Sequence, residues 1–444
     1  MDTTAKMARS YREDRPATAT ADFYAPMQDF AALGAREDVA AALAAAGATR
    51  PSHAQAVAFL PLLRGEKSEQ AGRRKDVLLA DRAGGGKTLA YLAPLLQAVV
   101  ARESARGTRA EHPSVVIVVP TGQLASQVRG VLRLLSQGGL RVRSMAATGG
   151  RPIRTQRDAL QEGVDVVVGT PQRLLALHDD GCLDLGDVFD IVFDEADVLL
   201  RREGGFREDS LLLRAMAGYA RAVFVTATMP AETLEDLRED LGDKEMEILT
   251  GPGVHRVPKG LQERLVDCSG GDEISEESGI KRKANALATI LESEKHVRTL
   301  VFCNKIETAR KLENLLKRKD RHSKQYQLFA YHAAVGEEKS SLKLERFLQP
   351  MRQLEPQRVL ISTDRASRGI DTAGIDHVVL FDLPREPSEY VRRVGRTARG
   401  AQGEGLVTVL ALGRHVPIAR NLIQRNQRGE PIHPPPEATR RKSK

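Results

Sequence analysis

Two stretches in the first half of the chain combine residue types that could do phosphate chemistry. Residues Val192–Leu200 begin as an apolar run and then place three carboxylates within four positions, at Asp194, Glu195 and Asp197. Such a run is typical of a buried strand that delivers acidic side chains to the edge of a sheet. A magnesium-bound nucleotide would supply the positive charge that these acids need. By itself the run is equally consistent with a strand followed by a solvated turn.

A glycine-rich loop upstream favours the nucleotide interpretation. Residues Ala83-Gly84-Gly85-Gly86-Lys87-Thr88 follow an apolar run and precede an apolar face at helical spacing. The glycines let the backbone approach phosphates, Lys87 supplies charge, and Thr88 supplies a hydroxyl for a metal ion. The following helix N-terminus adds unpaired N–H groups and a partial positive charge. A chance glycine turn is the alternative.

Composition limits the class of protein. The chain has 444 residues, enough for two or three domains, with 41% hydrophobic and 28% charged residues, as in ordinary globular proteins. Lysine and arginine exceed aspartate and glutamate by 67 to 59, and this net charge of +8 favours a polyanionic partner. The three cysteines, Cys182, Cys268 and Cys303, lack metal-ligand spacing, so we expect free thiols and no zinc site.

The two ends of the chain differ from its middle. No apolar stretch reaches the length of a membrane span, and the N-terminus lacks the apolar core of a secretory signal, so we expect a soluble intracellular protein without a membrane partner. Cytoplasm, nucleus and organelle stay open. Residues 1–22 are expected to be a disordered lead. Residues 426–444 are expected to be a basic tail, which either adds nonspecific phosphate contacts or only aids solubility.

Between these ends, short β-branched runs alternate with amphipathic helical stretches. This pattern predicts two α/β domains, each with a mostly parallel sheet covered by helices on both faces. The boundary is expected at residues 251–261, a flexible linker rich in glycine and proline between domains at 23–250 and 262–425. The strands are expected at 77–80, 115–119, 164–168, 190–193, 222–225, 299–303, 359–361, 377–381 and 407–410.

With these motifs the chain resembles the DEAD-box RNA helicases of superfamily two, over roughly Phe23 to Gln424. The resemblance implies two tandem RecA-like domains that bind ATP and Mg²⁺. It implies that Asp194 and Thr88 hold the metal and that Glu195 is the general base. It also implies that Asp197 connects the site to Thr226-Ala227-Thr228, a coupling element in which Thr226 and Thr228 provide the hydroxyls.

The resemblance extends to an adenine-reading motif upstream. Residues Gly47–Gln55 match that motif, with Phe30 at the expected distance before it. The amide of Gln55 can donate and accept hydrogen bonds at once and so distinguish adenine from guanine, while Phe30 offers a stacking face. The alternative for Phe30 is a plain core residue.

Three further motifs resemble the family's RNA-contacting loops. Their hydroxyls, backbone N–H groups and arginine suit phosphates and sugars rather than base edges, so sequence preference should be weak. Taken singly, each is also an ordinary helix-start turn. The expected contacts are Pro120, Thr121, Gly149, Gly150, Thr170, Pro171 and Arg173.

The second domain is expected to complete the catalytic site. Residues 362–371 resemble the family's fifth motif, in which Asp371 would hold the ribose and Thr363, Asp364 and Arg368 would face RNA or organise the cleft. In the segment Tyr390–Arg399 four arginines lie within eight residues, which is costly unless an anion neutralises them. Arg396 and Arg399 are the expected arginine fingers, although a solvated basic helix face is the alternative.

Several positions depart from the family pattern. Asp81 stands where the phosphate loop expects a small residue and would weaken nucleotide binding. Changes at the expected RNA-contacting and coupling positions make the coupling between RNA and ATP less certain than the binding of either. The altered positions are Gly122, Gln123, Glu337, Ser340 and Arg392.

The predicted function is therefore that of an ATP-dependent RNA helicase. It would bind single-stranded RNA without sequence preference, hydrolyse ATP, and separate short duplexes or remodel RNA–protein complexes, acting as a monomer with protein cofactors unknown. Two alternatives stay open: an ATP-switched RNA clamp with weak unwinding, and a phosphate-loop ATPase that acts on DNA or protein.

Overall fold

The structure is a computed structural model of the whole chain. It describes residues 23–26, 29–64, 74–106, 112–202, 204–242, 245–258, 260–270, 275–294, 298–322, 324–332, 337–351, 355–364, 374–398 and 403–433.

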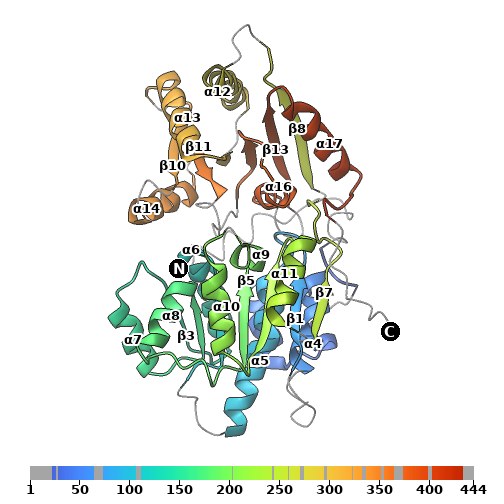
Figure 1. Cartoon of the computed structure of the whole chain (residues 1–444), viewed down its shortest axis with the longest axis vertical. Helices are drawn as coiled ribbons and strands as arrows, with labels where there is room; N and C mark the ends of the chain where they lie inside the picture. Colours follow the sequence, from blue (N-terminus) through green and yellow to red (C-terminus); the bar gives the residue numbers. More distant parts are fainter. Residues whose placement is uncertain are drawn as a thin grey trace.

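The first half forms a seven-stranded sheet in the order β3-β4-β2-β5-β6-β1-β7, with every strand pair parallel (Figure 1). Because the strands are parallel, their carboxyl ends lie at one edge, where the candidate residues follow them. The strands are β1 (Asp76–Ala80), β2 (Val115–Val118), β3 (Ser144–Ala147), β4 (Val166–Gly169), β5 (Asp190–Asp194), β6 (Arg221–Thr226) and β7 (Met246–Thr250).

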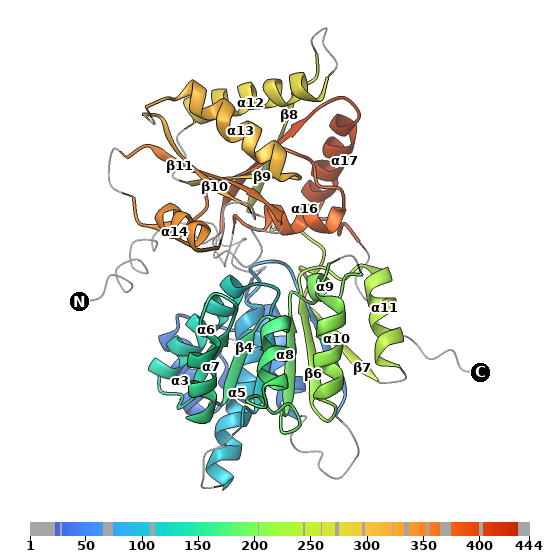
Figure 2. The ribbon, with the colours of Figure 1, turned by 60° about the vertical axis from the view of Figure 1, so that its left-hand side comes forward.

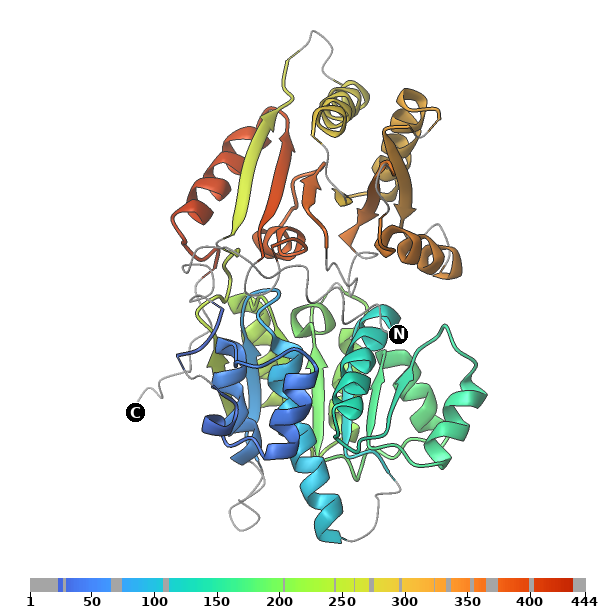
Figure 3. The ribbon, with the colours of Figure 1, turned by 180° about the vertical axis from the view of Figure 1, so that it is seen from behind.

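Helices cover both faces of this sheet. Alternate residues of β1 show the arrangement: Val77 and Leu79 pack into one apolar cluster, and Leu78 packs into the other. The first cluster is covered by α3 (Glu37–Ala45), α4 (His53–Arg64), α5 (Lys87–Arg106) and α6 (Gly122–Gln137), seen from behind in Figure 3. The second is covered by helices that lie on the near side in Figure 2: α7 (Ile153–Gln161), α8 (Pro171–Asp179), α9 (Ala196–Leu199), α10 (Arg207–Met216) and α11 (Ala231–Leu241).

The second half repeats this architecture with six parallel strands in the order β10-β11-β9-β12-β13-β8. The strands are β8 (Leu261–Asp267), β9 (Arg298–Cys303), β10 (Tyr326–Tyr331), β11 (Gln357–Thr363), β12 (His377–Leu380) and β13 (Gly405–Ala411). One face packs against α12 (Glu276–Ser293) and α13 (Ile306–Lys319). The other packs against α14 (Glu337–Leu348), α16 (Pro387–Val394) and α17 (His415–Gln427).

These two parallel sheets with helices on both sides match the RecA-like pair that the sequence predicts. All nine expected strands are present, and the structure adds β3, β7, β8 and β10. No helix among the described residues is both long and apolar enough to cross a membrane.

The linker differs from its expected form. Gly251 donates a backbone hydrogen bond to Ala80 at 2.9 Å, and Val254 and His255 are buried. The part of the linker next to the first sheet is therefore docked rather than loose, because its backbone and side chains find partners there.

Helix α16 is held in place by two buried polar groups. Arg393 is fully buried and donates to Asp364, to Asn304 Oδ1 and to the carbonyl of Asp382. On the other side, the hydroxyl of Tyr390 donates to Glu263 of β8. These contacts set the position of the arginine-rich segment before any ligand binds.

The contact between Glu263 and Tyr390 predicts a pH-dependent stability. Burial raises the pKa of Glu263 from 4.5 to about 7, although hydrogen bonds from Tyr390 and Asn426 oppose this. Between pH 4.5 and pH 7, Glu263 is therefore protonated in the folded protein and ionised in the unfolded chain. The free energy of unfolding should therefore fall as pH rises from 4.5 to 7, by up to about 3 kcal/mol. In Glu263→Gln this fall should disappear, so the variant should melt above wild type at pH 8.

Thermal melts at pH 5 and pH 8 check this. Glu292→Gln, at an exposed glutamate of α12, is the matched control and should follow wild type. A Glu263→Gln variant that melts below wild type at pH 8 would contradict the assignment.

Candidate nucleotide and nucleic-acid site

The phosphate loop lies between β1 and α5, at the carboxyl edge of the first sheet. Gly84 and Gly86 have φ of 73° and 81°, a conformation that favours glycine. The ammonium of Lys87 donates to the carbonyls of Asp81 and Arg82 at 2.9 and 2.7 Å. Burial lowers the pKa of Lys87, while the charges of Asp81 and Glu195 oppose that shift. A phosphate entering the loop would replace these carbonyls as the partner of the ammonium.

Asp194 is the buried acid of the site. Its carboxylate accepts hydrogen bonds from the backbone N–H of Glu195 at 2.9 Å and from the hydroxyl of Tyr91 at 3.0 Å. Burial, and next the charge of Glu195, raise the pKa of Asp194 to about 6. A divalent cation would relieve both effects, and an aspartate oxygen with the hydroxyl of Thr88 is a suitable ligand set for Mg²⁺. These residues therefore fit the metal that the family implies.

Tyr91 was not predicted from the sequence. It lies three residues after Thr88 on α5, so the two side chains share one face of the helix. That spacing is the signal that could have identified it.

Glu195 occupies a conformation that few residues adopt. Its φ is 57° and its ψ 48°, in the left-handed region, and it immediately precedes α9. For a residue with a side chain this costs roughly 1 kcal/mol or more, and such strain clusters at functional sites. The turn separates Glu195 from the buried Asp194 and leaves its side chain partly accessible.

Asp197 connects the first half of the site to the second. Its two carboxylate oxygens accept hydrogen bonds from the hydroxyls of Thr226 at 2.9 Å and Thr228 at 2.7 Å. The guanidinium of Arg392, from α16, lies 3.6 Å from the same carboxylate. Burial lowers the pKa of Arg392, but the charges of Asp197 and Glu195 outweigh burial and leave it raised. Figure 1 shows α9 and α16 facing each other between the two sheets.

Two further ion pairs connect the residues just after α9 with the first turn of α16. Arg201, just beyond α9, lies 3.0 Å from Glu386 and 3.6 Å from Glu389. A side chain at Gly395 would begin 2.7 Å from the Cβ of Ala83, so only glycine allows the segment after α16 to approach the phosphate loop this closely. The arginine-rich segment and the phosphate loop are therefore in contact.

Gln55 is tied to the phosphate loop. Its amide oxygen accepts from the N–H of Ser52 at 2.7 Å, and its amide nitrogen donates to the carbonyl of Gly86 at 3.3 Å. Phe30 is 3% exposed and packs among core residues, as its alternative assignment expects. Adenine recognition by Gln55 and Phe30 stays a prediction.

The three loops expected to contact RNA follow the neighbouring strands β2, β3 and β4. Gly149 and Gly150 are exposed, and a side chain at Gly149 would begin 4.0 Å from the guanidinium of Arg173. The buried Nη1 of Arg173 makes no hydrogen bond with the described residues. Thr121 caps α6, since its hydroxyl accepts from Leu124 N–H at 3.3 Å. Pro120 is buried, while Thr170 and Pro171 begin α8.

In the second half, Asp364 binds Arg393 through both carboxylate oxygens, and its role toward RNA or in the cleft stays a prediction. Thr363 is the last residue of β11 and is 7% exposed. Arg396 lies two residues after the end of α16 and is 8% exposed. Three predicted site residues, Arg368, Asp371 and Arg399, lie outside the described residues.

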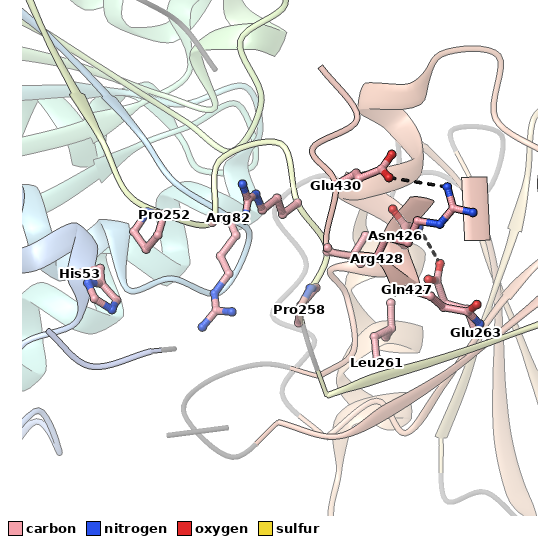
Figure 4. A pocket seen from close by; sticks show the side chains of 14 residues that line it. His53, Arg82, Pro252, Pro258, Leu261, Glu263, Asn426, Gln427, Arg428 and Glu430 are labelled. Carbon is pink, nitrogen blue, oxygen red and sulfur yellow. Dashed lines mark hydrogen bonds and ion pairs between the residues drawn. The ribbon is translucent and has the colours of Figure 1, made fainter. Parts of the chain in front are cut away.

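A pocket of about 540 Å³ opens beside the adenine motif, between the two halves (Figure 4). Its walls are His53 and Arg82 from the first half, Pro252 and Pro258 from the linker, and residues of β8 and α17 from the second. The cavity therefore joins both halves and the linker next to the phosphate loop.

Comparison with protein families agrees with this geometry. Residues 52–237 match the DEAD/DEAH box helicase model, and residues 282–401 match the helicase conserved C-terminal domain model. Among solved structures, the chain is similar to S. cerevisiae Dbp5 bound to RNA and ADP BeF3, with a TM-score of 0.72 and 20% identity, over 90% of this chain and 94% of that one. It is equally similar in fold to Mss116p bound to ssRNA and AMP-PNP, with a TM-score of 0.72 and 20% identity, over 90% and 76% of the two chains.

Two plant proteins are similar in sequence. The chain is 42% identical over 413 residues to DEAD-box ATP-dependent RNA helicase 50 of Arabidopsis thaliana, covering 92% of this chain and 51% of the relative. It is 41% identical over 414 residues to the protein of the same name from Oryza sativa subsp. japonica, covering 92% and 62%. The chain thus spans between half and two thirds of the length of these relatives. With both helicase models matched in tandem on two RecA-like sheets, the chain belongs to the DEAD-box helicase family.

Proposed function

We propose that this chain is an ATP-dependent RNA helicase whose ATP site is completed by closure of its two halves. The observation that carries the proposal is the contact between Asp197 of the first half and Arg392 of the second, beside the phosphate loop and the paired acids. The names of the plant relatives, both called ATP-dependent RNA helicases, support the same assignment. Because both halves of the site lie in one chain, we propose that it acts as a monomer.

The first half would bind ATP and Mg²⁺. Lys87 and the glycine loop would hold the phosphates, while Asp194 and Thr88 would hold the metal, which neutralises charge on the phosphates. Glu195 would take the proton of the attacking water. Gln55 would recognise adenine and link it to the phosphate loop, because its amide already donates a hydrogen bond to the carbonyl of Gly86.

The second half would stabilise the transition state. Arg396, and Arg399 beyond the described residues, would place positive charge against the transferring phosphoryl group. In comparable sites such an arginine contributes about 10³ to 10⁵ in rate. Asp371 would hold the ribose.

RNA would bind across the carboxyl edges of both sheets. Support comes from the unsatisfied Arg173 beside the exposed glycines, since an anion such as an RNA phosphate would complete its hydrogen bonds. Further contacts would come from Thr121, Thr170, Thr363 and Arg368. An RNA strand bent by the closed halves cannot stay in a regular duplex, so a short helix would open locally.

The departures from the family pattern favour one alternative, an ATP-switched clamp that unwinds weakly. RNA-stimulated phosphate release without displacement of a short duplex would support the clamp. No stimulation by RNA, with stimulation by DNA or by a protein, would support a different phosphate-loop ATPase.

Replacing the proposed general base should abolish turnover and keep binding. In Glu195→Gln we expect RNA-stimulated ATP hydrolysis to fall by about 10²- to 10⁴-fold, because the amide cannot accept the proton. Binding of a fluorescent ATP analogue should stay within about threefold of wild type. Glu208→Gln, at an exposed glutamate of α10, is the matched control and should hydrolyse ATP normally. Wild-type rates in Glu195→Gln would contradict its role.

Asp81 should oppose nucleotide binding through its charge. Its carboxylate accepts a hydrogen bond from the N–H of Gly253 at 3.1 Å, which an asparagine oxygen could also accept. Asp81→Asn therefore removes the charge and keeps the hydrogen bond, and we expect the Kd for ATP to fall by about three- to tenfold. Titration with a fluorescent ATP analogue measures this. Weaker binding in Asp81→Asn would mean that the carboxylate supports the loop instead.

A further inference from the structure

The linker is docked on the nucleotide site at its first residues. Gly251 N–H donates to the carbonyl of Ala80, the last residue of β1, and Gly253 N–H donates to the Asp81 carboxylate. A side chain at Gly251 would collide with the carboxylate of Asp81, so the linker passes directly over the start of the phosphate loop. The position of the linker is therefore set by the same loop that would bind phosphates.

His255 makes a second connection, which reaches both halves of the protein. Its side chain is completely buried, and its Nε2 accepts a hydrogen bond from the N–H of Met229 at 2.8 Å. The other nitrogen, Nδ1, must then carry the proton in the neutral ring, and it donates to the carbonyl of His433 at 3.1 Å. In addition, Ile432 N–H donates to the carbonyl of His255 at 2.9 Å.

These partners belong to opposite halves of the protein. Met229 directly follows the coupling element Thr226–Thr228, whose hydroxyls hold Asp197. Ile432 follows α17 and packs into the core of the second half. One imidazole thus joins the element beside the catalytic acids to the body of the other half.

The backbone of His255 supports a dedicated role. Its φ is 57°, in the left-handed region, which costs a residue with a side chain roughly 1 kcal/mol or more. A passive spacer would relieve this strain with glycine or asparagine. The strained conformation is what presents both ring nitrogens and the carbonyl to three different partners.

We propose that His255 is a positioning residue that couples the Thr226–Thr228 element to the placement of the second half, so that RNA-driven closure is felt at the ATP site. This proposal rests on the proposed function, because it concerns how RNA stimulates hydrolysis. His255 touches neither substrate nor the reacting atoms. It acts through hydrogen bonds that both halves must satisfy together.

Two substitutions separate the role of the ring from that of the backbone. His255→Asn keeps a residue that tolerates the left-handed conformation and a donor near His433, but it lacks the acceptor for Met229. His255→Gly relaxes the backbone and removes both side-chain connections. His433→Ala is the matched control, since it removes a ring packed edge-on at 5.6 Å but keeps the backbone carbonyl that His255 uses.

The measurement is ATP hydrolysis with and without saturating single-stranded RNA, together with circular dichroism melts. For His255→Asn and His255→Gly we expect RNA stimulation to fall about tenfold, with the rate without RNA within about twofold of wild type. His433→Ala should keep wild-type stimulation. A role in folding alone would lower the melting temperature without changing the ratio of the two rates.

Two results would overturn the proposal, and they are distinguishable. If RNA stimulates wild type and stimulates either His255 variant equally, the role of His255 is overturned and the proposed function stands. The same holds if His433→Ala loses as much stimulation as the His255 variants. Wild type without any RNA stimulation overturns the proposed function, and the coupling role with it.

Discussion

The structure depends on how one buried carboxylate, that of Asp197, is satisfied. A buried charge is costly unless paired, and this one receives two threonine hydroxyls from its own half and a guanidinium from the other half. If the halves separate, the guanidinium of Arg392 leaves with the second half and the carboxylate keeps only neutral donors. Closure and the electrostatics of Asp194, Glu195 and Asp197 would therefore be linked, and a polyanion that favours closure would change both together.

Two departures from the family pattern, at Arg392 and Asp81, are explained by the contacts that these residues make. Arg392 stands where the family has histidine, and its permanent charge faces both Asp197 and Glu195. The carboxylate of Asp81, whose charge is unfavourable for binding phosphates, accepts a hydrogen bond from the linker backbone at Gly253. Arg392 thus places charge on a contact between the two halves, and Asp81 places charge on the contact between the first half and the linker. Nothing in the described residues explains the changes at Gly122 and Gln123.

The sequence predicted the central strands and the place of Asp194, Glu195 and Asp197 at the edge of the sheet, because buried parallel strands are apolar throughout and deliver polar residues at their carboxyl ends. The four missed strands, β3, β7, β8 and β10, are the edge strands of their sheets. Edge strands have one neighbour and mixed composition, as in Leu261–Asp267, so they lack a continuous apolar signal. Long-range contacts were likewise not predicted: the spacing from Thr88 indicates the helix face on which Tyr91 lies, but its partner Asp194 and the partners of His255 are residues that only the fold brings close.

The central claim is that ATP and RNA together hold the two halves in the closed arrangement. Small-angle neutron scattering of the full chain, in an H2O/D2O mixture that matches out the scattering of RNA, tests it most directly, with four samples: no ligand, a nonhydrolysable ATP analogue, single-stranded RNA, and both. We expect the protein's radius of gyration to be smallest with both ligands, and we expect Arg392→Glu, which places like charge against Asp197, to abolish this contraction. Equal radii in all four samples, or full contraction in Arg392→Glu, would contradict it.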